Sequence, residues 1–400
     1  MMSAPAVAVT GIGALCAAGP NLERCTEALF AGQRAPAPPT HFTTDHAEAY
    51  PVFEVPDEFL PGDLSGRNLL HRTTRLALAA TLQALEDADL SPANLHGARI
   101  GVCVGTTVGS AMNNEAFYRG VRDGEHPALD AIHRFLRSNP AAAVSRRYGL
   151  DGPCQTVVNA CSSGTDAIGI AAGWLRSGVC DAVLAGGADE LCRVTYDGFA
   201  SLLIADTSPV RPFDVNRRGL NLGEGAAMLV LESEAFRRRR NGRVRARVLG
   251  YGSACDAHHL TAPHPDGRGL RQALAEALAG GGIARAEIAF VNAHGTGTPD
   301  NDRVEGRVLG EELPGVPYLS TKGCTGHTLG AAGALEAAFT VACLERGQVT
   351  GSVGCEQPDP ELGPPPVLTP TAITGRVALS QSLAFGGNNA VLVLAAGGPE

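Results

Sequence analysis

The chain has 400 residues, of which 44% are hydrophobic and 18% are charged, and this composition predicts a folded protein with a large core and two closely packed halves. Its net charge of −9 argues against a general nucleic-acid-binding protein, because attraction to phosphates needs a basic face. No apolar run approaches the roughly 18 residues needed to span a membrane. The 11 cysteines include no C-x-x-C pair, which fits neither a disulfide framework nor a zinc site, so we expect a cytoplasmic protein.

Strand-like apolar runs alternate with helical stretches rich in Ala and Leu along the whole chain. In chain order, we expect a strand at 7–10, a helix at 75–88, strands at 99–104 and 155–159, a helix at 166–176, a strand at 182–185, a helix at 269–279, strands at 289–291 and 318–320, a helix at 331–344, and strands at 377–380 and 391–394. This alternation is typical of an α/β architecture with buried sheets. The proline-rich stretches 35–40 and 357–370 are predicted to be surface loops.

Two segments indicate that the halves of the chain, which we place at 1–249 and 250–400, are related. The strand at 156–159 runs into Ala160-Cys161-Ser162-Ser163-Gly164, and the strand at 318–320 runs into Gly323-Cys324-Thr325-Gly326-His327. Each segment places a reactive side chain where a strand turns into a helix of small residues. We expect such matched turns to bring two helix N-termini toward one cleft.

Cys161 is a candidate nucleophile. It stands at the first turn of a predicted helix, where the helix dipole and free backbone N–H groups favour a thiolate. Taken alone, a buried structural thiol is the common alternative for any cysteine. The other elements of the pattern favour the functional reading.

His294 and His327 are two imidazoles on separate strand-to-loop turns. A metal site would need further ligands, and Cys324, Asp302 and Glu305 form no recognised ligand pattern, so we expect no metal. Lys322 is the only lysine among the 32 lysine and arginine residues, which indicates that its glycine-lined turn requires a compact ammonium. Chance retention of a single lysine is the alternative.

Four motifs together resemble the β-ketoacyl-ACP synthases of the elongating type I/II class. In chain order they are NACSSG with Cys161, NAHGTGTPDND with His294, STKGCTGHTLGAAG with Lys322 and His327, and FGGNNA with Phe385. The resemblance covers nearly the whole chain and implies an α/β thiolase fold, a five-layered αβαβα arrangement of two duplicated halves. Thiolase itself is disfavoured because Phe385 stands where its second catalytic cysteine is expected. The initiating synthases and chalcone-synthase relatives use Cys-His-Asn, whereas this chain has a second histidine.

The resemblance implies a 3-oxoacyl-ACP synthase, an acyltransferase that forms a carbon–carbon bond. It would condense an acyl group held on Cys161 with malonyl-ACP, by decarboxylative Claisen chemistry, in fatty acid or polyketide biosynthesis, polyenes included. The implied partners are acyl carrier protein and a second ketosynthase-like subunit, in a homodimer or a heterodimer, with no nucleic acid and no membrane. No cofactor is implied beyond the phosphopantetheine arm of the carrier. The alternatives are a tunnel-shaping partner subunit with little activity of its own, and a cysteine hydrolase.

The resemblance also assigns roles to single residues. The Cys161 and Phe385 amides would stabilise the oxyanion, His294 and His327 would donate to an enolate, and Lys322 would pair with Glu305 to support the histidines. The remaining implied contacts are Thr296 and Thr298 with the phosphopantetheine arm, Phe385 and Gly386 at the gate with Phe199 beside them, and Val108 on the acyl tunnel. Ordinary core packing is the alternative for Phe199 and Val108.

An acidic carrier must dock on a local basic patch of this negatively charged chain. Arg67, His71, Arg72 and Arg75 on one helical stretch are the candidates, and a solvated helix face is the alternative. The gate motif departs from the common Gly-Phe-Gly-Gly-Thr-Asn, because Ala384 precedes Phe385 and Leu383 stands where an aromatic residue is frequent. We therefore expect acyl-chain preference, and not reaction type, to differ from that of housekeeping enzymes.

Overall fold

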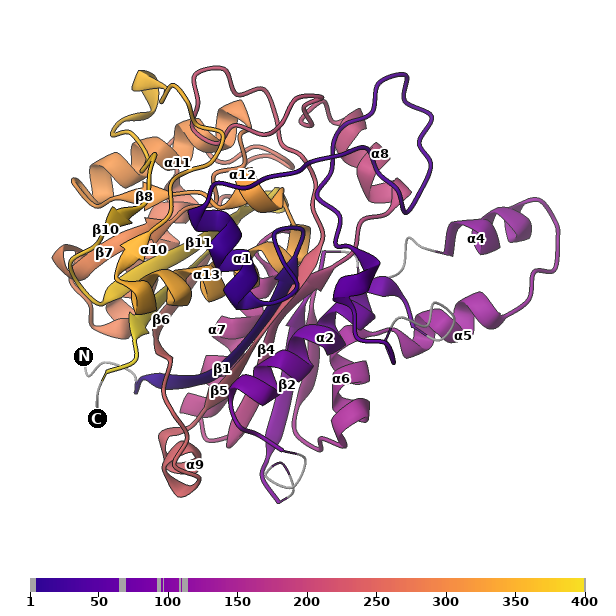
Figure 1. The fold of residues 1–400 in the computed structure, drawn as a ribbon, viewed down its shortest axis with the longest axis horizontal. Helices are drawn as coiled ribbons and strands as arrows, with labels where there is room; N and C mark the ends of the chain where they lie inside the picture. The colour runs from indigo at the N-terminus through magenta and orange to yellow at the C-terminus, as the bar shows by residue number, and fades with distance from the viewer. Residues whose placement is uncertain are drawn as a thin grey trace.

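The computed structural model describes residues 5–64, 70–91, 95, 97–107, 109 and 114–398. Ten strands of these residues form one sheet in the order β3-β2-β4-β5-β1-β6-β12-β11-β7-β8 (Figure 1). The strands are β1 (Val7–Cys16), β2 (Ile100–Gly105), β3 (Cys154–Val157), β4 (Ala182–Asp189), β5 (Gly225–Glu232), β6 (Ala246–Cys255), β7 (Ile288–Asn292), β8 (Tyr318–Leu319), β11 (Val377–Ala384) and β12 (Asn388–Ala396). A second, small sheet pairs β9 (Gln348–Val349) with β10 (Thr371–Ala372).

The described helices surround this sheet. They are α1 (Leu22–Phe30), α2 (Arg72–Asp87), α4 (Glu115–Arg122), α5 (Asp130–Arg137), α6 (Pro140–Tyr148), α7 (Ser163–Arg176), α8 (Arg193–Ser201), α9 (Glu234–Arg239), α10 (Arg268–Gly281), α11 (Pro299–Glu312), α12 (Lys322–Thr325) and α13 (Ala332–Arg346). Short 3₁₀ turns are η1 (Asp57–Phe59), η3 (Arg285–Glu287), η4 (Leu329–Ala331), η5 (Pro360–Leu362) and η6 (Phe385–Gly387). Within the described residues, no helix is both long and apolar enough to cross a lipid bilayer.

The sheet consists of two halves with the same strand order. The first half reads β3-β2-β4-β5-β1 and the second β8-β7-β11-β12-β6, so that each strand has a counterpart. In each half the first two pairings are parallel and the last two are antiparallel. Antiparallel pairing of β1 with β6 joins the halves. The predicted duplication is therefore confirmed, whereas the division at 249/250, which lies inside β6, stays a prediction.

Five layers follow from the way the helices pack. α2 covers β1, β5 and β4 on one outer face, and α10 covers β6 and β12 on the other. α7 and α13 pack against each other between the halves, and both contact the sheet. Their small residues permit this approach, since a Cβ added at Gly164 would lie 2.8 Å from the Ala334 nitrogen and one added at Gly333 would lie 2.0 Å from the Thr165 hydroxyl. The predicted αβαβα thiolase fold is confirmed.

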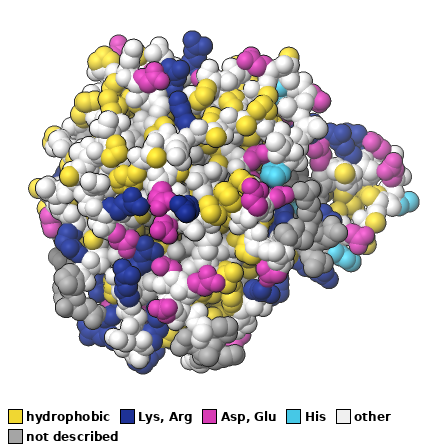
Figure 2. All heavy atoms as spheres, in the orientation of Figure 1, with side chains coloured by type: hydrophobic (Ala, Val, Ile, Leu, Met, Phe, Trp, Pro, Cys, Tyr) yellow, Lys and Arg dark blue, Asp and Glu magenta, His cyan; other side chains and the backbone are white. Residues whose placement is uncertain are grey.

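One segment projects from this body. α4 and α5 extend away from the sheet, at the right of Figure 1. Neither helix was expected from the sequence. Their apolar side chains Tyr118, Val121, Leu129 and Leu136 are more than half exposed. In Figure 2, hydrophobic side chains lie at the surface of this segment beside basic and acidic ones.

Candidate active site

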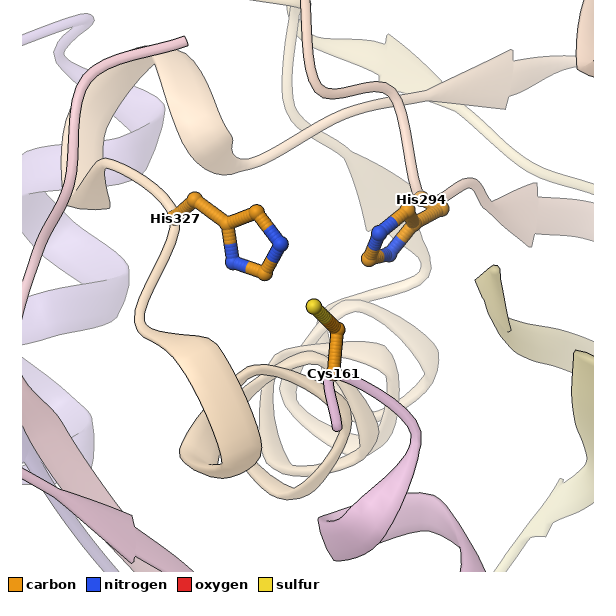
Figure 3. Close-up of side chains that lie close together, drawn as sticks. All are labelled: Cys161, His294 and His327. Atoms are coloured by element: carbon orange, nitrogen blue, oxygen red, sulfur yellow. The ribbon is translucent and has the colours of Figure 1, made fainter. Parts of the chain in front are cut away.

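Cys161, His294 and His327 come from three separate turns and meet in one place (Figure 3). A single sulfur or ring nitrogen from each residue lies within 4.8 Å of the corresponding atoms of the other two. The imidazole ring centroids are 5.2 Å apart, with the rings nearly perpendicular at 87°. All three side chains are buried. The convergence predicted for these residues is therefore present in the fold.

Cys161 is presented by a sharp turn between β3 and α7. Ala160 adopts a left-handed conformation with φ of 49°, which reverses the chain just before the cysteine. The Ser163 hydroxyl holds this turn by accepting from the Asn159 amide at 2.8 Å and donating to the Ala160 carbonyl at 2.6 Å. The thiol therefore points away from the helix start toward the two imidazoles (Figure 3).

The protonation state of Cys161 differs from the sequence-based expectation. Burial raises the pKa of its thiol to about 12, although Lys322 and the Phe385 amide act in the opposite direction. The expected thiolate at the helix start is therefore wrong for the resting site, because loss of water outweighs the helix-start stabilisation. At neutral pH the Cys161 side chain is therefore a thiol.

His327 is fixed in one tautomer by the turn that follows it. Its backbone N–H donates to the Asn221 carbonyl at 2.8 Å, and its ring Nδ1 accepts from the Leu329 N–H at 3.1 Å. Leu329 reaches that position only with a left-handed φ of 55°. Burial, followed by the charge of Lys322, holds the pKa of His327 well below its usual range. The neutral ring therefore carries its proton on Nε2, which makes it a hydrogen-bond donor.

His294 has the same tautomer for a different reason. The Lys322 ammonium lies 3.2 Å from its Nδ1 and donates to its carbonyl oxygen at 2.6 Å. Burial, followed by Lys322 and His327, keeps the pKa of His294 well below its usual range. The loop itself is held by Glu305, whose two oxygens accept from the amides of His294 at 2.6 Å and Gly295 at 2.7 Å. Both imidazoles are thus neutral Nε2–H donors.

The predicted Lys322–Glu305 pair is wrong. The Lys322 ammonium pairs instead with Glu336 of α13, and both side chains are almost completely buried. Glu305 is unavailable because its oxygens are occupied by the His294 loop and by the Gln381 side chain at 2.6 Å. Burial raises the pKa of Glu336 to about 7 against the lowering effect of Lys322. Lys322 still supports His294, but with a different carboxylate.

One cavity of about 270 Å³ contains the three converging side chains. Thr296 and Thr298 line it with their hydroxyls 2.8 Å apart. Phe199 and Phe385 line another part and are stacked, with ring centroids 5.4 Å apart and planes at 17°. The Gly386 N–H is already used, because it donates to the Leu260 carbonyl at 2.8 Å. The Gly386 N–H is therefore not a free oxyanion donor.

The proposed carrier-docking residues are not supported by the fold. Arg72 and Arg75 are only 7% and 8% exposed, and His71 is also buried. The Arg72 guanidinium forms ion pairs with Glu224, at 2.7 Å, and with Asp57, because the segment around Asp57 covers the start of α2. A docking surface needs exposed charge, so Arg72 and Arg75 are wrong as docking residues. Arg67 and Val108 lie outside the described residues.

The donor set does not suit a metal ion. Cys161, His294 and His327 are the residue types that bind zinc. A ligating imidazole must direct a lone pair at the metal, yet Nε2 of His327 carries the proton because Nδ1 accepts from Leu329. The cluster is therefore built to donate hydrogen bonds.

Two functional residues were missed from the sequence. Glu336 is an isolated carboxylate within the apolar helix α13, and such a residue is a signal of a buried ion pair. Asp189, at the end of β4, accepts from the Thr106 hydroxyl at 2.6 Å and from the amides of Thr107 at 2.7 Å and Gly330 at 2.6 Å. It thereby fixes the η4 turn that follows His327. No local pattern in the sequence marks this residue.

Comparisons with known proteins agree with this geometry. Residues 4–236 match the family model of the beta-ketoacyl synthase N-terminal domain, and residues 245–356 match that of the C-terminal domain. The chain is 34% identical to 3-oxoacyl-[acyl-carrier-protein] synthase 2 of Synechocystis sp., over 96% of this chain and 97% of the relative. It is 33% identical to the granaticin polyketide putative beta-ketoacyl synthase 1 of Streptomyces violaceoruber, over 97% of both chains. The solved ishigamide ketosynthase/chain length factor superposes with a TM-score of 0.91 at 32% identity, covering 98% of this chain and 99% of that one.

Proposed function

The chain belongs to the β-ketoacyl synthase family, and on that premise we propose that it condenses an acyl group held on Cys161 with a malonyl unit carried by an acyl carrier protein. The observation that carries this proposal is the convergence of one thiol and two neutral imidazoles, both donating from Nε2, in one cavity. A nucleophile that holds one acyl group and paired donors for an enolate are the two requirements of this reaction.

The first half-reaction is thioester exchange. The Cys161 sulfur attacks the acyl carbonyl, a carbon–sulfur bond forms to Cys161, and the carbon–sulfur bond to the carrier breaks. The thiol proton of Cys161 ends on the departing carrier thiol, so no net proton is consumed. The Phe385 amide, which faces the Cys161 sulfur, and the amide of Cys161 stabilise the tetrahedral oxyanion.

The second half-reaction forms the carbon–carbon bond. The malonyl carboxylate leaves as CO₂, and the electron pair of the broken bond moves onto the thioester oxygen as an enolate. The Nε2–H groups of His294 and His327 donate to that oxygen. Because both rings are neutral, they can donate without a change in their protonation state. The enolate carbon then attacks the acyl carbonyl on Cys161, and the carbon–sulfur bond to Cys161 breaks. Cys161 leaves as a thiolate, and one proton taken from water restores the thiol.

Other residues bind and orient in this proposal. Thr296 and Thr298 contact the phosphopantetheine arm, and the stacked Phe199 and Phe385 gate the acyl chain. Glu305 and the Lys322–Glu336 pair position His294. No further cofactor is required, because the chemistry is complete with the carrier-bound thioesters. The 11 described cysteines are all unpaired, which supports a reducing, cytoplasmic setting.

A related subunit completes the assembly in this proposal. The ishigamide ketosynthase is described together with a chain length factor. In this chain β3 is an end strand of the sheet, and α4 and α5 expose apolar side chains, which offers a place for a homodimeric or heterodimeric partner. A tunnel-shaping subunit with little activity of its own is the second candidate. The presence of Cys161 with both imidazoles favours the catalytic subunit.

Intact-mass analysis after incubation with carrier-bound acyl groups of graded length tests the proposal. We expect a single adduct on Cys161, with a length preference, and none on Cys161→Ala. Acyl transfer to that variant would overturn the nucleophile assignment. An unmodified wild-type chain across the whole panel would instead support the tunnel-shaping subunit.

A further inference from the structure

Arg218 lines the cavity that contains Cys161, and its side chain is exposed. Within the part of the chain that the structure describes, its guanidinium makes no hydrogen bond and no ion pair. Its neighbour Arg217 is different, because it donates to Asp359 and to the Asp214 carbonyl at 2.6 and 2.9 Å. Arg218 is thus a free cation at the entrance of the candidate active site.

The backbone around Arg218 is held firmly beside the threonine pair. The Leu220 N–H donates to the Ile204 carbonyl at 2.8 Å. A Cβ added at Gly297 would lie 3.0 Å from the Gly219 carbonyl, so the segment that carries Arg218 packs directly against the loop of Thr296 and Thr298. The position of the residue is therefore fixed, while its side chain stays free to meet a ligand.

The two carboxylates on the cavity wall already have partners of their own. Asp300 pairs with Arg303 at 3.0 Å. Asp256 accepts from the amides of His264 at 3.0 Å and Gly269 at 2.9 Å. Both imidazoles are neutral. Among the described lining residues, Arg218 is the one cation, and it attracts an anion to the entrance.

We propose that Arg218 binds the phosphate of the phosphopantetheine arm while the thioester end of that arm reaches Cys161. This rests on the proposed function, which brings an arm with a thioester at one end and a phosphodiester at the other into this cavity. The planar guanidinium suits a phosphate because it can donate two parallel hydrogen bonds. Thr296 and Thr298 lie beside it, where the amide-containing middle of the arm passes.

An acidic surface of the carrier protein is the competing ligand for this cation. Such a surface is met by several exposed cations, whereas Arg218 stands alone on this wall next to the apolar Leu203, which is 84% exposed. A single guanidinium group at the entrance matches a single phosphate better than it matches a patch of carboxylates. The two ligands are separable because a phosphate can be supplied without the carrier protein.

The test measures the second-order rate of Cys161 acylation by intact mass, with one acyl group presented on three donors. The donors are the acyl carrier protein, free phosphopantetheine and free pantetheine, which lacks the phosphate. We expect Arg218→Ala to slow loading about tenfold from the first two donors and to leave loading from pantetheine unchanged. Arg218→Lys retains the charge and should recover part of the loss. Arg243→Ala is the control, because Arg243 is an exposed arginine that lies outside this cavity.

Each other result has one meaning. If Arg218→Ala slows Cys161 acylation only when the donor is the carrier protein, Arg218 contacts the carrier surface and the phosphate contact is wrong. Equal acylation rates for wild type and Arg218→Ala on all three donors would also overturn the phosphate contact. If the wild-type chain loads from none of the donors, the condensing function itself fails. That outcome is distinct because it does not depend on residue 218.

Discussion

Glu305→Gln tests whether the His294 loop is positioned by a single carboxylate. Four donors reach Glu305: the amides of His294 and Gly295, the Gln381 side chain, and the Asn301 side chain at 3.3 Å. A carboxylate accepts all four, whereas an amide has one acceptor oxygen and adds two donors of its own. Two buried donors therefore lose their acceptor.

At about 1–3 kcal/mol for each unsatisfied buried donor, we expect the free energy of unfolding to fall by about 2–6 kcal/mol. Displacement of His294 should also slow condensation about 10²-fold, because one enolate donor is lost. Loading of Cys161 should stay within a few-fold of wild type, since none of the four donors belongs to the Cys161 turn.

Urea unfolding at fixed protein concentration measures the first quantity, and separate loading and condensation assays measure the other two. Glu312→Gln is the matched control, because Glu312 lies on the same helix but pairs with Arg271 and Arg285 at the surface, where such pairs contribute about 0–1 kcal/mol. If Glu305→Gln unfolds like Glu312→Gln and condenses at the wild-type rate, the assigned role of Glu305 is wrong.

Three further predictions concern the histidine pair. His327→Ala should load acyl groups normally but condense about 10²–10³-fold more slowly, and loss of loading with intact decarboxylation would show that the roles are misassigned. The condensation rate should rise with pH through about 7, because the pKa of Glu336 is raised to about 7 and only the ionised carboxylate pairs with Lys322. Glu336→Gln should abolish this rise. A pH–rate profile of condensation measures the effect, and the pH–rate profile of acyl loading is the control. Asp189→Asn should slow condensation more than loading, because it loosens the Gly330 amide behind His327, and equal slowing of both steps would contradict that role.

Much of the active site could be predicted because its residues lie at positions that the chain marks locally. Cys161, His294 and His327 each follow a strand at a turn of small residues, and parallel strands bring such turns to one edge. The strand order then places them in one cavity. The same logic explains why the fold class and its duplication were predictable.

The errors concern burial, which a local pattern does not reveal. The sequence predicts a basic face at the helix start around Arg72, yet the Asp57 segment folds over it and Arg72 forms a buried ion pair. The family resemblance implies Glu305 as the partner of Lys322, whereas its partner Glu336 lies on α13, the helix that follows α12. The sequence shows a helix start at Cys161 and therefore predicts an ionised thiol. It does not show the burial that removes water from the thiol and raises its pKa.

The matching strand orders of the two halves determine which half supplies each functional group of the site. α7 follows β3 and α12–α13 follows β8, so the thiol and the His327 imidazole occupy equivalent places in the two halves. One half holds the thiol that carries the acyl group, and the other supplies the hydrogen-bond donors for the enolate. A substitution in one half can therefore remove one chemical task and leave the other.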